Sequence, residues 1–291
     1  MSQIISGFLH TRPPFVLNCN GRLLDLTEGV IMGILNITPD SFFDGGKFTE
    51  ERIILEKTEE MITNGATVVD IGGASSRPGA QNISPQKEIQ RVLPAIRAIR
   101  KRFPDIFISI DTYQSEVASI ALEEGVDILN DISAGTIDPQ ILSIAHKSNR
   151  PYILMHMQGT PENMQTAPAY EDVVYEVSEF LVKKAGALRS SGCTDIILDP
   201  GFGFGKSTHH NYQLLKNLPA LHLLGYPLLC GFSRKSMINK VLGTTPESAL
   251  NGTTVLNTIA LMAGVHILRV HDVKEARQAL DLCNYLLKTT T

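Results

Sequence analysis

Eight short apolar runs recur along this chain, and stretches with helical periodicity separate them. The runs lie at 30–36, 66–72, 106–111, 126–131, 152–156, 194–199, 227–231 and 265–270. Strands that are apolar on both faces and separated by helices are typical of a parallel sheet. Eight such units in succession predict an α/β fold whose sheet closes into a (β/α)8 barrel, the TIM barrel. An open, doubly wound sheet is the competing architecture.

The length of the chain suits a single barrel. With 291 residues and no linker or low-complexity segment, the chain is expected to form one domain over 1–291. The segment 15–26, FVLNCNGRLLDL, has the pattern of a β-hairpin that turns at Asn20-Gly21. We expect this hairpin to close the bottom of the barrel.

Composition narrows the class of protein. Apolar residues make up 43% of the chain and the net charge is −4, which argues against a broad nucleic-acid-binding face but not against a small anion site. The amino-terminal stretch lacks the features of a signal peptide, and no apolar run approaches membrane-spanning length. We expect reduced, buried thiols and a cytoplasmic protein, because the cysteines are far apart and lack the spacing of a zinc site. They are Cys19, Cys193, Cys230 and Cys283.

Nearly every predicted strand ends in a polar residue. Strand carboxyl ends converge on one mouth of a barrel, where active sites form. A single aspartate there is often only a helix cap, but a ring of polar endings favours a site. Arg269 and His271 are two residues apart and therefore point to the same face. The endings are Asn36, Asp70, Asp111, Asn130 with Asp131, His156, Asp199, Ser233, Lys235, Arg269 and His271.

These endings divide into two chemical groups. Carboxylates and amides can bind the amide and amino edge of a flat heterocycle, and here they are Asp111, Asn130 and Asp199. Donors suited to a phosphate or pyrophosphate are Arg77, Arg269, His271 and Ser233. Asn36 offers a neutral oxygen suited to Mg²⁺, which takes few protein ligands. The pattern indicates a polar heterocycle at one end of the site and a phosphorylated group at the other.

Three features have competing interpretations. The run GFGFGKST at 201–208 ends like a phosphate-binding P-loop, but Pro200 stands where that motif needs glycine. Lys235 could form a Schiff base, although a hydrogen-bonding lysine is the commoner case. His156 could be a general base, and a packed histidine with satisfied hydrogen bonds is at least as common.

From about residue 30 to the carboxyl end, the chain resembles the dihydropteroate synthase family. The motifs GILNITPDSFFDGG, DIGGASSRPGA, SIDTY, ILNDIS, LMHMQGTP, IILDPGFGFGK, GFSRKS and LRVHDV occur in the family's order. The resemblance implies a transferase of folate biosynthesis that joins 7,8-dihydropterin-6-ylmethyl diphosphate to para-aminobenzoate, giving 7,8-dihydropteroate and pyrophosphate. The family is the target of sulfonamide inhibitors, which mimic para-aminobenzoate. The resemblance also implies a homodimer that pairs through late helices.

Residue by residue, the resemblance implies three binding regions. The pterin would be held by Asp111, Asn130, Met157, Asp199 and Lys235. The diphosphate would be held by Asn36, Ser76, Arg77, Arg269 and His271, with Mg²⁺ at Asn36 and Asp44 as a second candidate ligand. The groups around para-aminobenzoate would be Phe42, Pro78, Phe204, Ser233 and Lys235. The chemistry would depend on Asp111, Lys235, Asp44, Arg269 and His271.

The chain departs from the family's usual motif near the expected anion site. Ala74 stands where many members have glutamate, Ser76 replaces threonine, and Phe43 occupies a position that is often serine. Loops 37–46 and 73–82 are expected to close over the second substrate. A dissociative, Mg²⁺-assisted reaction is expected, without a protein nucleophile. The rival readings are a pterin-binding methyltransferase acting on a methylated folate, and a non-catalytic pterin-binding paralogue.

Overall fold

The computed structural model describes residues 10–37, 46–74 and 83–289. The strands are β1 (Val16–Cys19), β2 (Arg22–Asp25), β3 (Val30–Asn36), β4 (Val68–Gly72), β5 (Phe107–Asp111), β6 (Ile128–Asp131), β7 (Tyr152–Met155), β8 (Ile196–Asp199), β9 (Leu229–Cys230) and β10 (Ile267–Val270). The helices are α1 (Gly46–Thr63), α2 (Pro85–Arg102), α3 (Ser115–Glu123), α4 (Gln140–Ser148), α5 (Val173–Ser190), α6 (Thr208–Lys216), α7 (Leu218–Leu221), α8 (Ser236–Leu242), α9 (Leu250–Met262) and α10 (Val273–Thr289).

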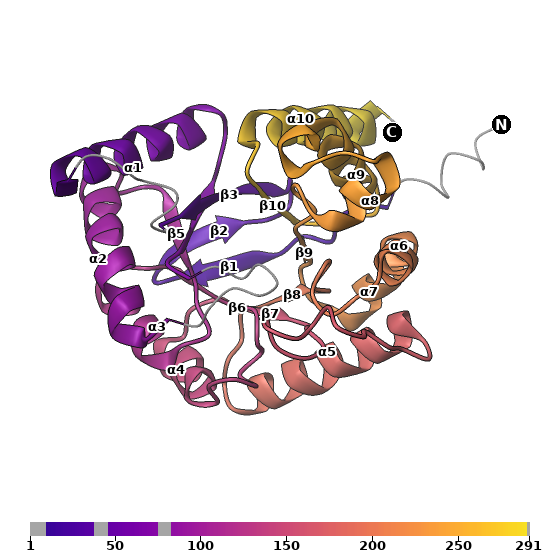
Figure 1. Cartoon of the computed structure of the whole chain (residues 1–291), viewed down its shortest axis with the longest axis horizontal. Coiled ribbons are helices and arrows are strands. Elements are labelled where there is room, and N and C mark those ends of the chain that lie inside the picture. The colour runs from indigo at the N-terminus through magenta and orange to yellow at the C-terminus, as the bar shows by residue number, and fades with distance from the viewer. Residues whose placement is uncertain (1–9, 38–45, 75–82, 290–291) are drawn as a thin grey trace.

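Strands β3 to β10 form a parallel barrel inside a ring of helices (Figure 1). Their order in the sheet is β8-β7-β6-β5-β4-β3-β10-β9. The two ends of that order meet, because Leu198 forms a parallel bridge with Leu228 and its amide donates to the carbonyl of Pro227 at 2.9 Å. The predicted (β/α)8 barrel is therefore confirmed over the open sheet. The predicted strand at 227–231 is reduced to the two residues of β9.

Alternation along each barrel strand separates two buried clusters. Of every two successive residues in a strand, one faces the surrounding helices, as Ile31, Val69 and Leu198 do. The other faces the barrel interior, where the amino-terminal halves of the strands form an apolar layer. That layer contains Val30, Met32, Val68, Ile128, Ile153, Ile197, Leu229 and Ile267. Continuing the same alternation toward the carboxyl ends places polar side chains in the barrel mouth.

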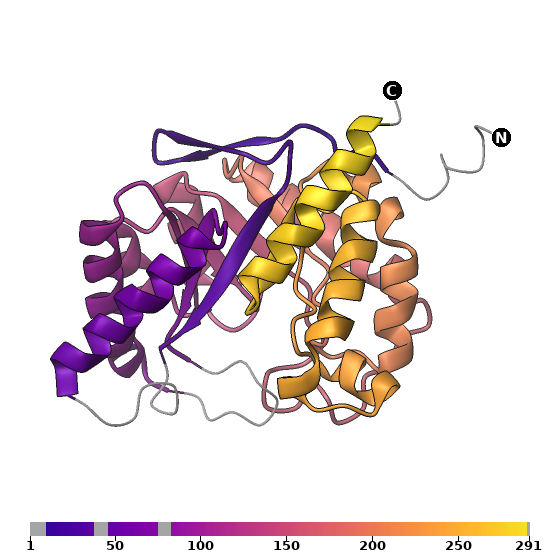
Figure 2. The ribbon, with the colours of Figure 1, turned by 90° about the horizontal axis from the view of Figure 1, so that it is seen from above.

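The amino-terminal hairpin closes the opposite end of the barrel, as predicted. Asn20 and Gly21 have φ angles of 57° and 83°, which suit a tight two-residue turn between antiparallel strands. The inward residues of the hairpin join the apolar layer of the barrel and are Leu17, Cys19, Leu24 and Leu26. Figure 2 shows β1 and β2 lying across that end.

Helix α5 illustrates how the outer helices pack against the barrel. Val173, Val177 and Leu181 are buried on α5, and Glu179 pairs with Lys183 at 3.0 Å on its surface. The four cysteines are buried and free of disulfides. Within the described residues, no helix combines the length and apolarity needed to cross a membrane.

Candidate active site

One row of residues crosses four neighbouring strands at the barrel mouth. Asn36 is the register partner of Gly72, Gly72 of Asp111, and Asp111 of Asn130. A methyl group at Gly72 would lie 3.4 Å from Oδ1 of Asn36 and 3.6 Å from Cβ of Asp111. The glycine therefore leaves open the space between an amide oxygen and a carboxylate, both predicted to act in the site.

Arg269 on β10 connects two carboxylates across this row. Its Nε donates to Oδ2 of Asp70 at 2.6 Å, and its Nη2 donates to Oδ2 of Asp111 at 2.6 Å. Asn130 also donates to Oδ2 of Asp70, at 3.1 Å. Arg269, predicted to bind the diphosphate, is thus in direct contact with a residue predicted to bind the pterin. The two predicted groups are continuous rather than separate.

Asp70 is the site residue that sequence reasoning placed at a strand end but gave no role. Its side chain is completely buried. Among the described residues, its Oδ1 has no hydrogen-bond partner although that atom is buried. The alternation along β4 was the available signal, because Val68 lies in the inner apolar layer and residue 70 has the same parity.

Burial controls the ionisation of these acids. Desolvation raises the pKa of Asp111 to about 7, against the opposing effect of Arg269 and with a further rise from Asp70. Desolvation likewise raises the pKa of Asp199, while Lys235 opposes it. Burial alone would lower the pKa of Arg269. The negative charges of Asp70 and Asp111 outweigh this effect and raise its pKa above the ordinary value, so they stabilise the guanidinium cation in the mouth.

Lys235 lies between the acids and an aromatic side chain. Its Nζ donates to the carbonyl of Phe202 at 2.5 Å and lies 4.7 Å from the ring centroid of Phe204. Burial lowers the pKa of Lys235 to about 8, and the attraction of Asp199 limits the shift. These contacts are those of a hydrogen-bonding lysine, and they place it beside both the predicted pterin and para-aminobenzoate residues.

Ser233 and His271 join the loops after β9 and β10. The Oγ of Ser233 lies 2.9 Å from Nδ1 of His271 and accepts a bond from the His271 amide at 3.2 Å. Next to them, Arg234 pairs with Asp272 through two bonds of 3.2 and 2.5 Å. The structure therefore brings together two side chains predicted as anion donors and locks their loops with an ion pair.

Two other strand endings point away from the mouth. Asp131 accepts from the Tyr152 hydroxyl at 2.6 Å and from the amides of Ser133 and Gly135, so it caps a turn on the outer side of β6. His156 lies 2.9 Å from Nζ of Lys206 and packs edge-on against Phe180. Desolvation lowers the pKa of His156 to about 3. This histidine is packed and satisfied, not a general base.

The remaining predicted residues divide by location. Met157 lies two residues beyond the end of β7 and is half-buried. Five predicted residues lie outside the described part of the chain: Phe42, Asp44, Ser76, Arg77 and Pro78. The closing segments predicted at 37–46 and 73–82 fall largely in the same undescribed ranges.

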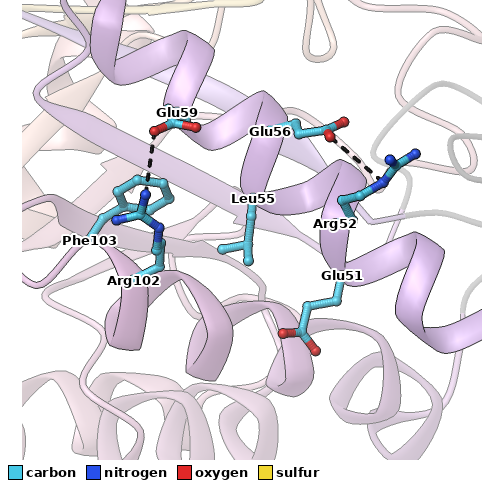
Figure 3. Close-up of a pocket in the computed structure, with 7 residues that line it drawn as sticks. All are labelled: Glu51, Arg52, Leu55, Glu56, Glu59, Arg102 and Phe103. Carbon is cyan, nitrogen blue, oxygen red and sulfur yellow. Dashed lines mark ion pairs between the residues drawn. The ribbon is translucent and has the colours of Figure 1, made fainter.

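A surface pocket of about 250 Å³ lies elsewhere, on the outer layer of the barrel (Figure 3). It is lined by Glu51, Arg52, Leu55, Glu56, Glu59, Arg102 and Phe103, from α1 and the end of α2. Its ion pairs, Arg52–Glu56 and Arg102–Glu59, are both 3.7 Å long and exposed. This pocket contains none of the strand-end residues.

The mouth offers an oxygen donor that a hard divalent cation could use. Among the described residues, no group of three or more His, Cys, Asp or Glu side chains could hold a metal by itself. Asn36 nevertheless offers an oxygen beside the gap at Gly72. A single amide oxygen fits Mg²⁺, which keeps several waters and completes its shell with phosphate oxygens.

Comparison with known proteins identifies relatives of this chain in sequence and in structure. The family model described as pterin binding enzyme matches residues 32–271. Dihydropteroate synthase of Escherichia coli strain K12 is 44% identical over 266 residues, which cover 91% of this chain and 94% of that protein. The Yersinia pestis dihydropteroate synthase, solved with a sulfonamide drug, has a TM-score of 0.88 and 41% identity, covering 94% of this chain and 100% of that one. The Xanthomonas albilineans enzyme, solved with 4-aminobenzoic acid, has a TM-score of 0.88 and 38% identity, covering 94% and 99%.

Proposed function

We propose a role for each residue of the mouth on the premise that this chain belongs to the dihydropteroate synthase family. As an enzyme of that family, it condenses 7,8-dihydropterin-6-ylmethyl diphosphate with para-aminobenzoate, giving 7,8-dihydropteroate and pyrophosphate. One observation carries the assignment of roles: Arg269 binds Asp70 and Asp111 at 2.6 Å each, so a cation and two acids meet at the centre of the mouth.

The pterin binds against the acids and amides of the inner row. A pterin ring presents N–H and amino donors beside a carbonyl acceptor. Asp199 and Asp111 accept from those donors, and Asn130 can both donate and accept. Burial of Asn130 and Asp199, and partial burial of Asp111, strengthens these bonds because little water competes with them. Met157 lies next to this region and is assigned to the face of the ring.

The diphosphate binds where Arg269, His271 and Ser233 converge. The guanidinium has five N–H donors, and the two carboxylates accept from two of them, so Arg269 can also donate to an anion. His271 and Ser233 are already held together at 2.9 Å and add donors from the neighbouring loop. Asn36, and Asp44 outside the described residues, would hold Mg²⁺. The metal would supply charge neutralisation of the departing diphosphate.

Para-aminobenzoate binds beside Phe204 and Lys235, which are in contact with each other. The ring of Phe204 offers an apolar face, and the Lys235 ammonium 4.7 Å from it carries the positive charge. The bond between the pterin methylene and the diphosphate oxygen breaks, and its electron pair leaves with the diphosphate. Asp111 stabilises the positive charge left on the methylene and ring. The amine of para-aminobenzoate then bonds to the methylene and loses a proton, without a protein nucleophile.

Two rival functions have weaker support. A methyltransferase would not need the donors of Arg269, His271 and Ser233 in one place. A non-catalytic paralogue would not need Lys235 placed between the pterin side and Phe204. The relatives with 44% identity over 91% of the chain bear the name of the synthase.

Formation of dihydropteroate by purified wild-type protein and two matched variants tests the proposal. Asp199→Asn removes the carboxylate at the mouth end of β8. Asp195→Asn changes the same residue type just before β8, where Asp195 accepts from the amide of Asn18 at 3.0 Å. We expect Asp199→Asn to lose activity by about 100-fold and Asp195→Asn to keep it, because one well-placed charged contact contributes about that much. Equal activity in the two variants would contradict the placement of the pterin.

We also propose that two copies of the chain pair through α8 and α9, and that the protein is cytoplasmic. These helices lie together on one side of the barrel (Figure 1) and carry exposed apolar side chains. They are Val241, Leu242, Leu250, Val255 and Ile259. An exposed apolar group of this kind marks an interface, and the family resemblance favours a second copy. The four unbridged, buried thiols support a reducing compartment.

Sedimentation of a charged double variant tests the pairing. Val255 and Ile259 lie four residues apart on α9 and are 49% and 41% exposed. Val255→Glu with Ile259→Glu should convert a particle of twice the 31.9 kDa chain mass into one of the chain mass. Val182→Glu changes an equally exposed valine on α5 and should leave the mass unchanged. A wild-type protein of the single-chain mass would contradict the proposal.

A further inference from the structure

The loop from Pro200 to Lys206 follows β8 and ends in a buried lysine. Lys206 is only 2% exposed. Its Nζ lies 2.9 Å from the Gly201 carbonyl, 3.0 Å from the Phe204 carbonyl and 3.3 Å from the His156 carbonyl. The side chain thus points back into its own loop. This geometry excludes the P-loop reading of GFGFGKST, in which the lysine would extend toward a phosphate.

The loop packs so closely against the segment after β7 that only glycine fits at two points. A methyl group at Gly201 would lie 1.8 Å from the His156 carbonyl oxygen, and one at Gly205 would lie 2.3 Å from the Gln158 carbonyl oxygen. Their φ angles are 71° and 60°. This close packing brings several carbonyl oxygens to one buried point. Carbonyls that converge away from water need a donor between them, and Lys206 is that donor.

The segment between the two anchored carbonyls contacts Lys235, a residue of the mouth. Lys206 binds the carbonyls of Gly201 and Phe204, and the chain between them carries Phe202 and Gly203. The Phe202 carbonyl accepts from Lys235, and the Phe204 ring lies 4.7 Å from the same Nζ. A methyl group at Gly203 would lie 3.1 Å from Cδ of Lys235, so the lysine stem rests on this loop.

We propose that Lys206 is a positioning residue for the second substrate: by binding the loop carbonyls, it fixes the Phe204 ring against Lys235 and so sets the affinity for para-aminobenzoate. The inference rests on the proposed function, because para-aminobenzoate is the ligand assigned to Phe204 and Lys235. Lys206 does not itself reach the substrate. Burial lowers the pKa of Lys206 to about 7, while Asp199 opposes the shift.

The test compares Lys206→Met with Lys184→Met. Lys184 on α5 likewise donates to a backbone carbonyl, that of Ala134 at 3.0 Å, so the same chemical change there is a matched control. We expect Lys206→Met to raise the KM for para-aminobenzoate about tenfold while kcat and the KM for the pterin diphosphate change less than about twofold. Lys184→Met should change none of them.

A double-mutant cycle with Phe204→Ala distinguishes positioning from general damage. If Lys206 acts through Phe204, the KM effect of Lys206→Met should largely disappear in the Phe204→Ala background. Additive effects, or an equal rise in both KM values, would overturn the inference. Should Lys206→Met fail to fold, Lys206→Gln keeps an N–H donor and replaces it in the test. This variant should raise the KM for para-aminobenzoate about threefold and leave kcat and the KM for the pterin diphosphate nearly unchanged.

Calorimetric titration with para-aminobenzoate compares the affinities of the wild type and the two variants in the absence of turnover. We expect Lys206→Met to raise the dissociation constant about tenfold and Lys184→Met to leave it unchanged. A wild-type protein that binds para-aminobenzoate more tightly than Lys206→Met, yet forms no dihydropteroate, would refute the proposed function and uphold the inference. Equal affinity of the three proteins, or no binding by the wild type, would overturn the inference.

Discussion

Arg269 and Asp70 form a buried ion pair of 2.6 Å inside the barrel, although 199 positions of sequence separate them. Asp70 is completely buried on β4, whereas the Arg269 side chain is 19% exposed at the mouth. The acid therefore holds the guanidinium from beneath and leaves its exposed side toward the mouth. Asp70 is a positioning residue for Arg269.

Asp70→Asn should weaken both the fold and the reaction. A buried cation loses one of its two charged partners, so the free energy of unfolding should fall by about 3 kcal/mol, and kcat/KM for the pterin diphosphate by about 100-fold. Chemical denaturation and steady-state kinetics measure the two effects. The control is Glu56→Gln, which breaks an exposed pair with Arg52 at 3.7 Å and should cost less than about 0.5 kcal/mol. Equal costs for the two variants would refute the role of Asp70.

Activity should fall as pH rises through about 8, where Lys235 loses its proton. Burial lowers the pKa of this lysine to about 8 from the ordinary 10.5. Between those values the unfolded chain binds more protons than the folded chain, so this group's contribution to the free energy of unfolding rises with pH. Loss of kcat/KM without loss of folded protein would therefore identify the ammonium. Lys235→Arg stays charged and should remove this alkaline limb from the pH profile; an unchanged limb would assign it to another group.

Gly205→Ala should destabilise the protein more than Gly225→Ala. Both glycines have positive φ angles, 60° and 75°, so both variants incur a conformational cost of about 1 kcal/mol. A methyl group at Gly205 would meet the Gln158 carbonyl at 2.3 Å, whereas nothing lies within 4 Å at Gly225. The clash should add at least about 2 kcal/mol, measured by chemical denaturation. Similar losses for the two variants would mean that the loop after β8 can move away from residue 158.

Asn36→Ala should weaken the response to Mg²⁺. Because Asn36 is the proposed oxygen ligand of Mg²⁺, its loss should raise the Mg²⁺ concentration for half-maximal activity about tenfold. Magnesium titration of initial rates measures this shift. Asn18→Ala, in the hairpin at the other end of the barrel, should leave the titration unchanged. An unaltered magnesium requirement in Asn36→Ala would rule out this residue as the ligand.

Much of the mouth could be predicted from the sequence because strand alternation is regular. Ile197 and Asp199 have the same parity on β8, so an apolar inner residue near the strand start predicts an inward carboxylate at its end. The same rule separates Asn130, which faces inward, from the adjacent Asp131, which binds Tyr152 on the outer side. Motif order then supplied the family, and the comparisons agree with it.

Side-chain partners could not be predicted in the same way. The contact of Arg269 with Asp70 and Asp111 depends on the stagger of β10 against β4 and β5, with β3 lying between them. Sequence spacing contains no such information. In the sequence, Lys206 belongs only to a run that departs from the P-loop at Pro200 and to one family motif, and neither predicts its partners. Its actual acceptors are backbone carbonyls, which leave no trace in the side-chain pattern.

The most direct test of the account is simultaneous measurement of pyrophosphate and dihydropteroate from purified protein given the pterin diphosphate and Mg²⁺. We predict that the two products form in equal amounts, that both require the metal, and that both rise sharply when para-aminobenzoate is added. Pterin binding without release of pyrophosphate under any of these conditions would contradict the synthase function and leave a binding protein.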